Sequence, residues 1–246
     1  MHTIIADEGF YFGMGAFETL AVHAGKPLLL PHHMRRLDKA LDFLGIDRRK
    51  ADVQNAVNET LQSAEEGLRE NGTLKIIVTR KNIDVSLTES RYGPQAWEEG
   101  FTAAISTVRR NETSPFVYHK TLNYGDNIYE KRQAKARGID EPIFLNSRGE
   151  LCEGATSNIF LVRKGMLFTP PVVCGLLPGI AREMVIESHP VVQRAITPDE
   201  FPDFDEAFLT NSLFGIMPLL RIGKVHFDSR NMADALLEQL RPKLLG

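Results

Sequence analysis

Apolar residues recur at two different spacings in this chain, and short segments of the two kinds follow one another irregularly. Residues 16–30 alternate like two strands joined by a turn at Ala24-Gly25-Lys26-Pro27. Directly afterwards, apolar residues from Met34 to Leu44 form one stripe at helical spacing, which Gly45 ends. The two patterns do not alternate regularly, as they would in a doubly wound sheet. Their order predicts an α+β fold in two small domains.

The division between the domains is expected near the middle of the chain. Residues 81–98 show little periodicity and are expected to form a long loop, and residues 109–118 read as an irregular linker containing Ser114-Pro115. We therefore expect an N-terminal α+β domain at 1–110, a linker at 111–118 and a C-terminal α+β domain at 119–246. Further helices are expected at about 48–70, 126–137, 179–188 and from 228 onward, and further strands at 74–80, 101–108, 143–145, 158–162, 166–168 and 207–210.

Charge and composition exclude several classes of function. The 246 residues carry a formal net charge of −3, so no strong basic field indicates a nucleic-acid partner. No apolar run reaches the roughly 18 residues of a membrane span, and the N-terminus lacks the pattern of a signal peptide. The two cysteines, Cys152 and Cys174, suit a reducing compartment. We expect a cytoplasmic protein without a membrane or nucleic-acid partner.

Common catalytic motifs do not account for this chain. Gly13-Met14-Gly15-Ala16-Phe17-Glu18 begins like a dinucleotide fingerprint, but Glu18 stands at the third glycine position and a strand follows where a helix is required. The sequence contains no phosphate loop, HExxH, GxSxG or CxxC. The adjacent His32 and His33 would point in different directions on a helix, so we expect no metal site.

Several segments carry weak signals that each have an ordinary explanation. Leu177-Pro178-Gly179 leads into a helix whose free N–H groups would bind an anion, although Pro-Gly also simply begins helices. Lys120 follows the expected linker, where most lysines are solvated charges. The turn at 153–158 is rich in hydroxyl groups, and Thr210-Asn211-Ser212 ends a strand, but polar loops and turn caps look the same.

Taken together and in this order, these segments resemble the fold-type IV pyridoxal-phosphate (PLP) enzymes. That family includes branched-chain aminotransferases, D-amino-acid aminotransferases and aminodeoxychorismate lyases. The resemblance spans residues 7–218. It rests on the ordered set Gly13–Glu18, His33–Leu37, Lys120–Tyr124, Glu153–Asn158, Leu177–Ile180 and Thr210–Ser212.

The resemblance implies PLP as cofactor and a role for each matched residue. Lys120 would form a Schiff base with the cofactor and move a proton at the substrate carbon. Glu153 would face the pyridine nitrogen and keep the ring able to accept electrons. The residues that the resemblance assigns to cofactor binding are Arg36, Tyr124, Glu153, Ser157, Ile180, Ala181 and Ser212. The family usually has threonine at the position of Ala181, so a hydroxyl contact is lost there while the N–H group remains.

The sequence around Thr19 favours one branch of the family. Phe17-Glu18-Thr19 together with Thr210-Asn211-Ser212-Leu213 looks most like an aminodeoxychorismate lyase, which releases pyruvate from 4-amino-4-deoxychorismate and leaves 4-aminobenzoate, a folate precursor. Thr19 or Lys120 would return a proton to the departing carbon.

Substrate contacts, assembly and rival functions follow from the same resemblance. Arg80, Arg91 and Asn211 are candidates for substrate binding, although the arginines equally suit a solvated loop. A homodimer is expected, because relatives close the site with a neighbouring subunit. The alternatives are a transaminase of branched-chain or D-amino acids, which shares every cofactor residue, and a non-catalytic binding protein on the same scaffold.

Overall fold

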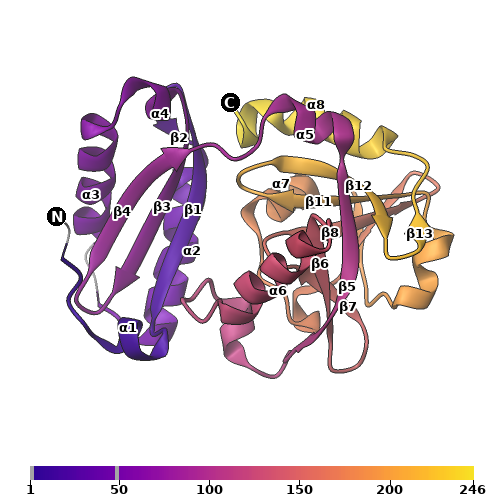
Figure 1. Ribbon diagram of the computed structural model, residues 1–246, viewed down its shortest axis with the longest axis horizontal. Helices are drawn as coiled ribbons and strands as arrows, with labels where there is room; N and C mark the ends of the chain where they lie inside the picture. Colours follow the sequence, from indigo (N-terminus) through magenta and orange to yellow (C-terminus); the bar gives the residue numbers. More distant parts are fainter. Residues whose placement is uncertain (1–2, 48–49) are drawn as a thin grey trace. The chain divides into compact units, whose positions relative to one another are not determined.

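The computed structural model describes residues 3–47 and 50–246, which form two compact α+β units (Figure 1). The first unit contains the chain up to residue 91, a segment at 119–124 and the C-terminal residues 243–246. The second unit contains residues 92–118 and 125–242. This division differs from the boundaries expected at 110 and 119: residues 92–110 belong to the second unit, and the Lys120 segment belongs to the first.

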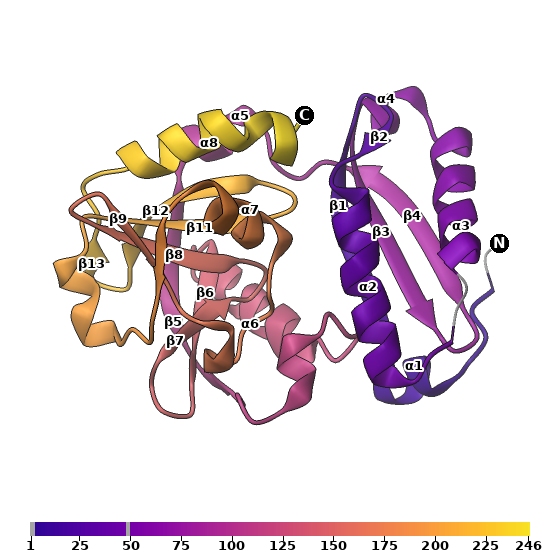
Figure 2. The same ribbon diagram turned by 180° about the vertical axis from the view of Figure 1, so that it is seen from behind.

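The first unit is built on an antiparallel sheet in the order β2-β1-β3-β4. The strands are β1 (Gly15–His23), β2 (Lys26–Pro27), β3 (Asn71–Thr79) and β4 (Ile83–Glu89). The helices are α1 (Glu8–Phe12), α2 (Leu30–Leu44), α3 (Lys50–Ser63) and α4 (Glu66–Glu70). Figure 2 shows α2 and α3 in front of the sheet, so both cover the same face. The expected turn between β1 and β2 is present, with Ala24 and Gly25 at positive φ.

Strand alternation explains why the two faces of this sheet differ. Leu20 and Val22 of β1 pair with Leu74 and Gly72 of β3 and are buried on the side of the helices. The next residues along each strand point to the opposite face. On α2, the stripe that includes Leu37 and Leu41 is buried against the sheet, and Gly45 ends the helix at φ 64°.

Two expectations for this unit are wrong. The stretch 81–98 is not a loop but contains β4 and, in the second unit, α5 (Pro94–Glu99). Ile83, Val85 and Leu87 alternate with polar residues over the seven residues of β4. This is the pattern of a half-buried strand, so the expectation of a loop overlooked a signal that the sequence carries. The single helix expected at 48–70 is interrupted between α3 and α4, and its expected start, residues 48–49, lies outside the described residues.

The second unit contains a nine-stranded mixed sheet in the order β10-β9-β8-β11-β12-β5-β6-β7, with β13 paired to β12. The strands are β5 (Phe101–Arg110), β6 (Glu141–Asn146), β7 (Leu151–Gly154), β8 (Asn158–Arg163), β9 (Met166–Thr169), β10 (Val191–Gln193), β11 (Glu206–Asn211), β12 (Gly215–Ile222) and β13 (Val225–His226). The further helices are α6 (Gly125–Ala136), α7 (Ile180–Ser188) and α8 (Asn231–Leu244), with short 3-10 turns at Pro115–Tyr118, Val172–Cys174 and Pro198–Asp203. Strand β5 belongs here because it pairs in parallel with both β12 and β6.

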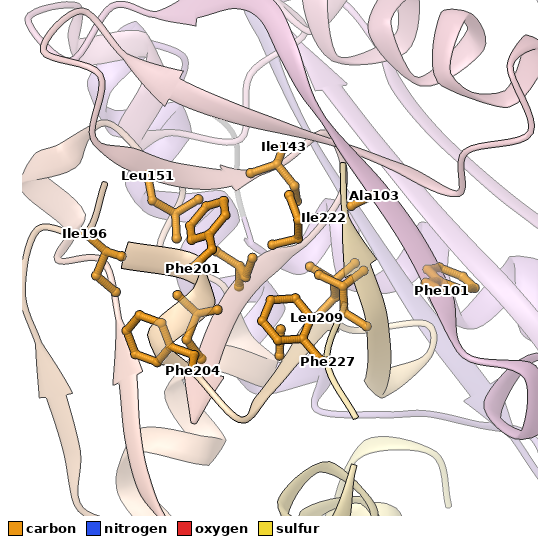
Figure 3. Packing of buried hydrophobic residues seen from close by; sticks show 14 of the residues in the cluster. Phe101, Ala103, Ile143, Leu151, Ile196, Phe201, Phe204, Leu209, Ile222 and Phe227 are labelled. Atoms are coloured by element: carbon orange, nitrogen blue, oxygen red, sulfur yellow. The ribbon is translucent and has the colours of Figure 1, made fainter. Parts of the chain in front are cut away.

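A continuous apolar core stabilises the second unit (Figure 3). Phe101 and Ala103 of β5 contribute to it together with Ile143 of β6 and Leu209 of β11, all of which are buried. The core gives the strand ends that carry polar side chains a rigid support. Within residues 3–47 and 50–246, no helix is both long and apolar enough to span a lipid bilayer.

Candidate active site

The segment 119–124 is attached to β1 by backbone hydrogen bonds. Thr121 forms an isolated antiparallel bridge with Ala16. The N–H of Phe17 donates to the carbonyl of Lys120 at 3.0 Å, and the N–H of Leu122 donates to the carbonyl of Gly15 at 2.8 Å. The backbone on both sides of Lys120 is therefore held like a short extra strand.

The side chain of Lys120 lies against two aromatic rings. Its Nζ is 4.4 Å from the ring centroid of Phe17 and 5.2 Å from that of Tyr124. The two rings meet edge to face, with centroids 5.1 Å apart. Such contacts restrict the conformation of the lysine side chain. The structure thus brings together the predicted residues Lys120 and Tyr124, with Phe17 as a partner that we did not foresee.

The face of the sheet opposite α2 and α3 carries a hydroxyl group beside a second ammonium group. Thr19 of β1 stands directly opposite Lys75 of β3. Because paired residues in an antiparallel ladder point to the same face, these two side chains are neighbours. The Nζ of Lys75 is 5.6 Å from the ring centroid of Phe17. The ring of Phe17 therefore has two ammonium groups beside it, from Lys75 and Lys120, and Lys75 is paired with Thr19.

On the helix side of β1, a buried carboxylate organises two residues of α2. Glu18 is fully buried, and Arg36 donates to it through Nε and Nη2, both at 2.7 Å. The Nδ1 of His33 lies 2.7 Å from Oε2 of Glu18. Burial alone would raise the pKa of Glu18, but Arg36 and then His33 outweigh it and hold that pKa well below its ordinary value.

His33 is the neutral member of this cluster. Burial is the largest cause that holds its pKa below the ordinary value; Glu18 raises that pKa, and the positive charges of Arg36 and Lys120 lower it further. A neutral ring with the proton on Nδ1 donates to Glu18. Its other nitrogen, Nε2, is buried and has no hydrogen-bond partner in the described part of the chain. Since Glu18 also accepts both hydrogen bonds from Arg36, it orients this predicted phosphate ligand.

We did not identify Glu18 or His33 as site residues from the sequence, although a signal was present. Period-two alternation places Glu18 on the apolar side of β1 with Leu20 and Val22. A carboxylate in such a position requires a cation or several donors. His33 and Arg36 are spaced by three residues, so they share one helix face and supply those donors.

In the second unit, Glu153 is held through both carboxylate oxygens. It lies in β7 and is largely buried. The Nη2 of Arg110, at the end of β5, is 3.1 Å from its Oε1, and the N–H of Leu177 donates to its Oε2 at 3.0 Å. Arg110 was not among the predicted residues, because its partner is distant in sequence.

The start of α7 is left open by its sequence. Gly179 precedes the helix, and no side chain caps it. The carbonyl of Leu177 accepts a hydrogen bond from Nδ2 of Asn158 at 2.9 Å, and a Cβ on Gly179 would lie only 2.0 Å from Oδ1 of the same asparagine. The first N–H groups of a helix lack acceptors within it, so the N–H groups of Ile180 and Ala181 are available to an anion.

The hydroxyl-rich turn after β7 is arranged around Glu141. This buried carboxylate accepts hydrogen bonds from the N–H of Thr156 at 2.7 Å and from Oγ of Ser157 at 2.8 Å. The Nδ2 of Asn211 donates to the carbonyl of Thr156 at 3.2 Å. Much of the polarity of Ser157 and Asn211 therefore shapes the turns, and their ligand roles stay predictions.

Three further candidates lie in more open positions. Arg80 is 59% exposed, and its Nε lies 3.5 Å from a carboxylate oxygen of Glu8. Arg91 is exposed as well, and Ser212 is half-buried in the turn after β11. Their substrate or cofactor contacts also stay predictions.

The residues present fit the requirements of PLP. The cofactor needs an amine for its aldehyde, an anion site for its phosphate and a carboxylate for its pyridine nitrogen. Within the first unit, Lys120 offers an amine. Within the second unit, Glu153 offers a carboxylate and the start of α7 offers an anion site. Among the described residues, the Oγ1 of Thr210 is buried without a hydrogen-bond partner, which leaves a donor available at the end of β11.

Comparison with known proteins agrees with this fit. Residues 15–222 match the family described as Amino-transferase class IV. A putative branched-chain-amino-acid aminotransferase of Methanocaldococcus jannaschii is 32% identical over 98% of this chain and 88% of its own length. An aminodeoxychorismate lyase of Bacillus subtilis is 26% identical over 92% of this chain and 83% of its own length.

A solved structure gives the same result for the fold. The structure of a putative 4-amino-4-deoxychorismate lyase from Legionella pneumophila superposes with a TM-score of 0.87 at 26% identity, covering 99% of this chain and 96% of that one. The family match spans residues 15–222 and includes Lys120, Glu153 and the start of α7. This chain therefore belongs to the class IV aminotransferase family and is a PLP-dependent enzyme.

Proposed function

We propose that this enzyme is an aminodeoxychorismate lyase, which converts 4-amino-4-deoxychorismate to 4-aminobenzoate and pyruvate. The observation that carries the proposal is the pair Thr19 and Lys75 on the β1 face that also holds Lys120 against Phe17. The substrate has two carboxylates and loses an enolpyruvyl group. A second ammonium group suits a carboxylate, and a hydroxyl suits proton delivery to the leaving group.

Each proposed step uses a group of this chain. Bound PLP supplies an electron sink. The Nζ of Lys120 removes the proton from the ring carbon that bears the substrate amine. The bond from the neighbouring ring carbon to the enolpyruvyl oxygen then breaks, and the ring becomes aromatic. Thr19 Oγ1 or Lys120 Nζ delivers a proton to the methylene carbon of the departing group, which becomes pyruvate.

The remaining residues are proposed to hold the cofactor. Arg36, fixed by its two hydrogen bonds to Glu18, and the N–H groups of Ile180 and Ala181 bind phosphate. The hydroxyl of Ser212 adds a donor. Glu153 binds the pyridine nitrogen, and Tyr124 donates to the ring oxygen.

A transaminase acting on branched-chain or D-amino acids is the second candidate. The relative from Methanocaldococcus jannaschii, named as a putative branched-chain-amino-acid aminotransferase, is 32% identical, which exceeds the identity to the Bacillus subtilis lyase. This reaction uses the same cofactor groups and differs in the substrate pocket.

Two parallel assays on the purified enzyme separate the candidates. With 4-amino-4-deoxychorismate, we expect 4-aminobenzoate and pyruvate in equal amounts. With leucine, L-alanine or D-alanine, we expect no ketoacid in excess of enzyme. Multiple turnovers of an amino acid to its ketoacid, without lyase turnover, would show that the lyase assignment is wrong.

Variants connect the assay to the Thr19 and Lys75 pair. Thr19→Val removes the hydroxyl at nearly constant volume and should lower lyase kcat by about 10²-fold, the usual scale for a lost acid–base group. Lys75→Met should mainly raise KM, because it removes a carboxylate contact. Lys26→Met, a change at the exposed end of the same sheet, is the control and should leave both constants unchanged.

We also propose that the enzyme is a homodimer. An exposed aromatic patch on α1 supports this proposal: Phe10 is 71% exposed, and Phe12 is 69% exposed. Tyr11 between them and the neighbouring Ile4 and Ile5 are also exposed. An apolar cluster of this kind marks an interaction surface.

A further inference from the structure

The ion pair between Arg110 and Glu153 is supported by a buried asparagine of α6. Asn127 is 4% exposed, and its Oδ1 accepts a hydrogen bond from Nη1 of Arg110 at 3.1 Å. Its Nδ2 donates to the carbonyl of Ala155 at 2.7 Å. A single amide therefore connects Arg110 with the turn that directly follows Glu153.

Other contacts restrict the guanidinium of Arg110 but do not select its rotation. Its Cζ lies 3.9 Å from the ring centroid of Phe144, so the group stacks on an apolar surface. Stacking permits rotation in the plane of the ring. Two contacts determine that rotation: Nη1 donates to the neutral amide of Asn127, and Nη2 pairs with the carboxylate of Glu153.

The orientation of Arg110 affects what Glu153 can do. The Oε1 of Glu153 faces Arg110 and its Oε2 faces the N–H of Leu177, so both oxygens are anchored from the protein side. A carboxylate anchored in this way presents its remaining lone pairs in one direction. If Arg110 rotated away, Oε1 would lose its cation and the carboxylate would turn about its contact with Leu177.

We propose that Asn127 is a positioning residue that keeps Glu153 aligned on the pyridine nitrogen of bound PLP by fixing Arg110 and the 153–157 turn. The inference rests on the proposed role of Glu153. An amide fits this task because it accepts from Arg110 and donates to a carbonyl at the same time, which neither a carboxylate nor an apolar side chain does.

Spectral titration of the holoenzyme tests this role. Glu153→Gln weakens the contact to the ring nitrogen and should shift the midpoint of the pH titration of the visible absorbance of bound PLP. Asn127→Leu, which keeps the branching at Cγ and removes both polar atoms, should shift the midpoint in the same direction by a smaller amount. It should also lower kcat about tenfold, with KM changed by less than twofold. In the Glu153→Gln background, Asn127→Leu should add no further shift.

Two additional variants separate positioning from general destabilisation. Asn127→Asp keeps the acceptor for Arg110, so its midpoint should lie between that of Asn127→Leu and that of the wild type. Glu130→Gln is the matched control: Glu130 is also buried on α6, but its Oε2 accepts from Oγ of Ser106 at 2.7 Å. It should lower stability without moving the midpoint.

The outcomes distinguish this inference from the cofactor assignment. A midpoint unchanged in Asn127→Leu, or moved opposite to Glu153→Gln, overturns the positioning role while the role of Glu153 stands. A Glu153→Gln enzyme whose titration matches the wild type overturns the role of Glu153, and the inference with it. If Asn127→Leu does not fold, a midpoint in Asn127→Asp that does not differ from wild type, or differs opposite to Glu153→Gln, overturns the inference.

Discussion

At the scale of single residues, buried polar groups determine which side chains must lie beside them. Glu18 is placed in an apolar layer, where an isolated carboxylate is unstable, and it is satisfied by Arg36 and His33. The arrangement gives Arg36 one orientation before any ligand binds. Glu18 is thus a structural residue whose effect on the cofactor would pass through Arg36.

The same cluster predicts how stability depends on pH. The pKa of His33 is lowered in the folded protein from an ordinary value of 6.5, so the unfolded chain binds a proton more readily. Stability is therefore fully present above pH 6.5 and declines as the pH falls from there toward the folded-state pKa. His33→Gln should flatten this decline.

Urea unfolding followed by circular dichroism between pH 5 and 8 measures the effect. His189→Gln is the control, because His189 lies half-buried at the end of α7. Equal slopes for the wild type and His33→Gln across this range would contradict the prediction.

At the scale of elements, function depends on how strands and helices end. Glu153 is the penultimate residue of β7, and Ile180 and Ala181 begin α7. Asn158 connects the two regions through the carbonyl of Leu177, while Leu177 itself donates to Glu153. The phosphate and pyridine contacts proposed above are therefore coupled through one short segment.

Gly179 is predicted to be irreplaceable at this junction. In Gly179→Ala, the added Cβ would stand 2.0 Å from Oδ1 of Asn158, so the segment must shift. We expect PLP retention to weaken about tenfold or more, measured as the dissociation constant by absorbance. Gly93→Ala is the matched control, because Gly93 also precedes a helix and an added Cβ would meet no atom within 4 Å. Equal affinities for the two variants would contradict this role.

At the scale of the whole molecule, two units of different construction share the chain. The first is an antiparallel sheet covered on one face by α2 and α3, and the second is a larger mixed sheet with an apolar core of aliphatic and phenylalanine side chains. The chain passes between the units more than once, since residues 119–124 return to the first. Lys120 therefore belongs to the first unit, whereas Glu153, 33 positions later, belongs to the second.

Dimer formation is the prediction that belongs to this scale. Size-exclusion chromatography with light scattering should give twice the chain mass of 27.6 kDa. The double variant Phe10→Asp/Phe12→Asp should be monomeric, because it places charge in the apolar patch. Met166→Asp, which changes an exposed residue of the second unit that is 54% accessible, should remain dimeric. A monomeric wild type would refute the proposal.

The sequence by itself determined the elements whose signals are local. The stripe and closing glycine of α2, the turn at Ala24 and Gly25, and the open start of α7 all follow from residues within a few positions of one another. The ordered motifs also identified the family and its cofactor.

Tertiary structure alone decided which distant segments meet. Strand β5 joined the second unit through β12 and β6, and the Lys120 segment joined the first through Ala16. Arg110 met Asn127 and Glu153 in the same way. Hydrogen bonds between strands and between buried side chains form wherever the whole fold brings donors and acceptors together. For Arg110, whose partners lie far from it in the sequence, no spacing along the chain records which groups it will meet.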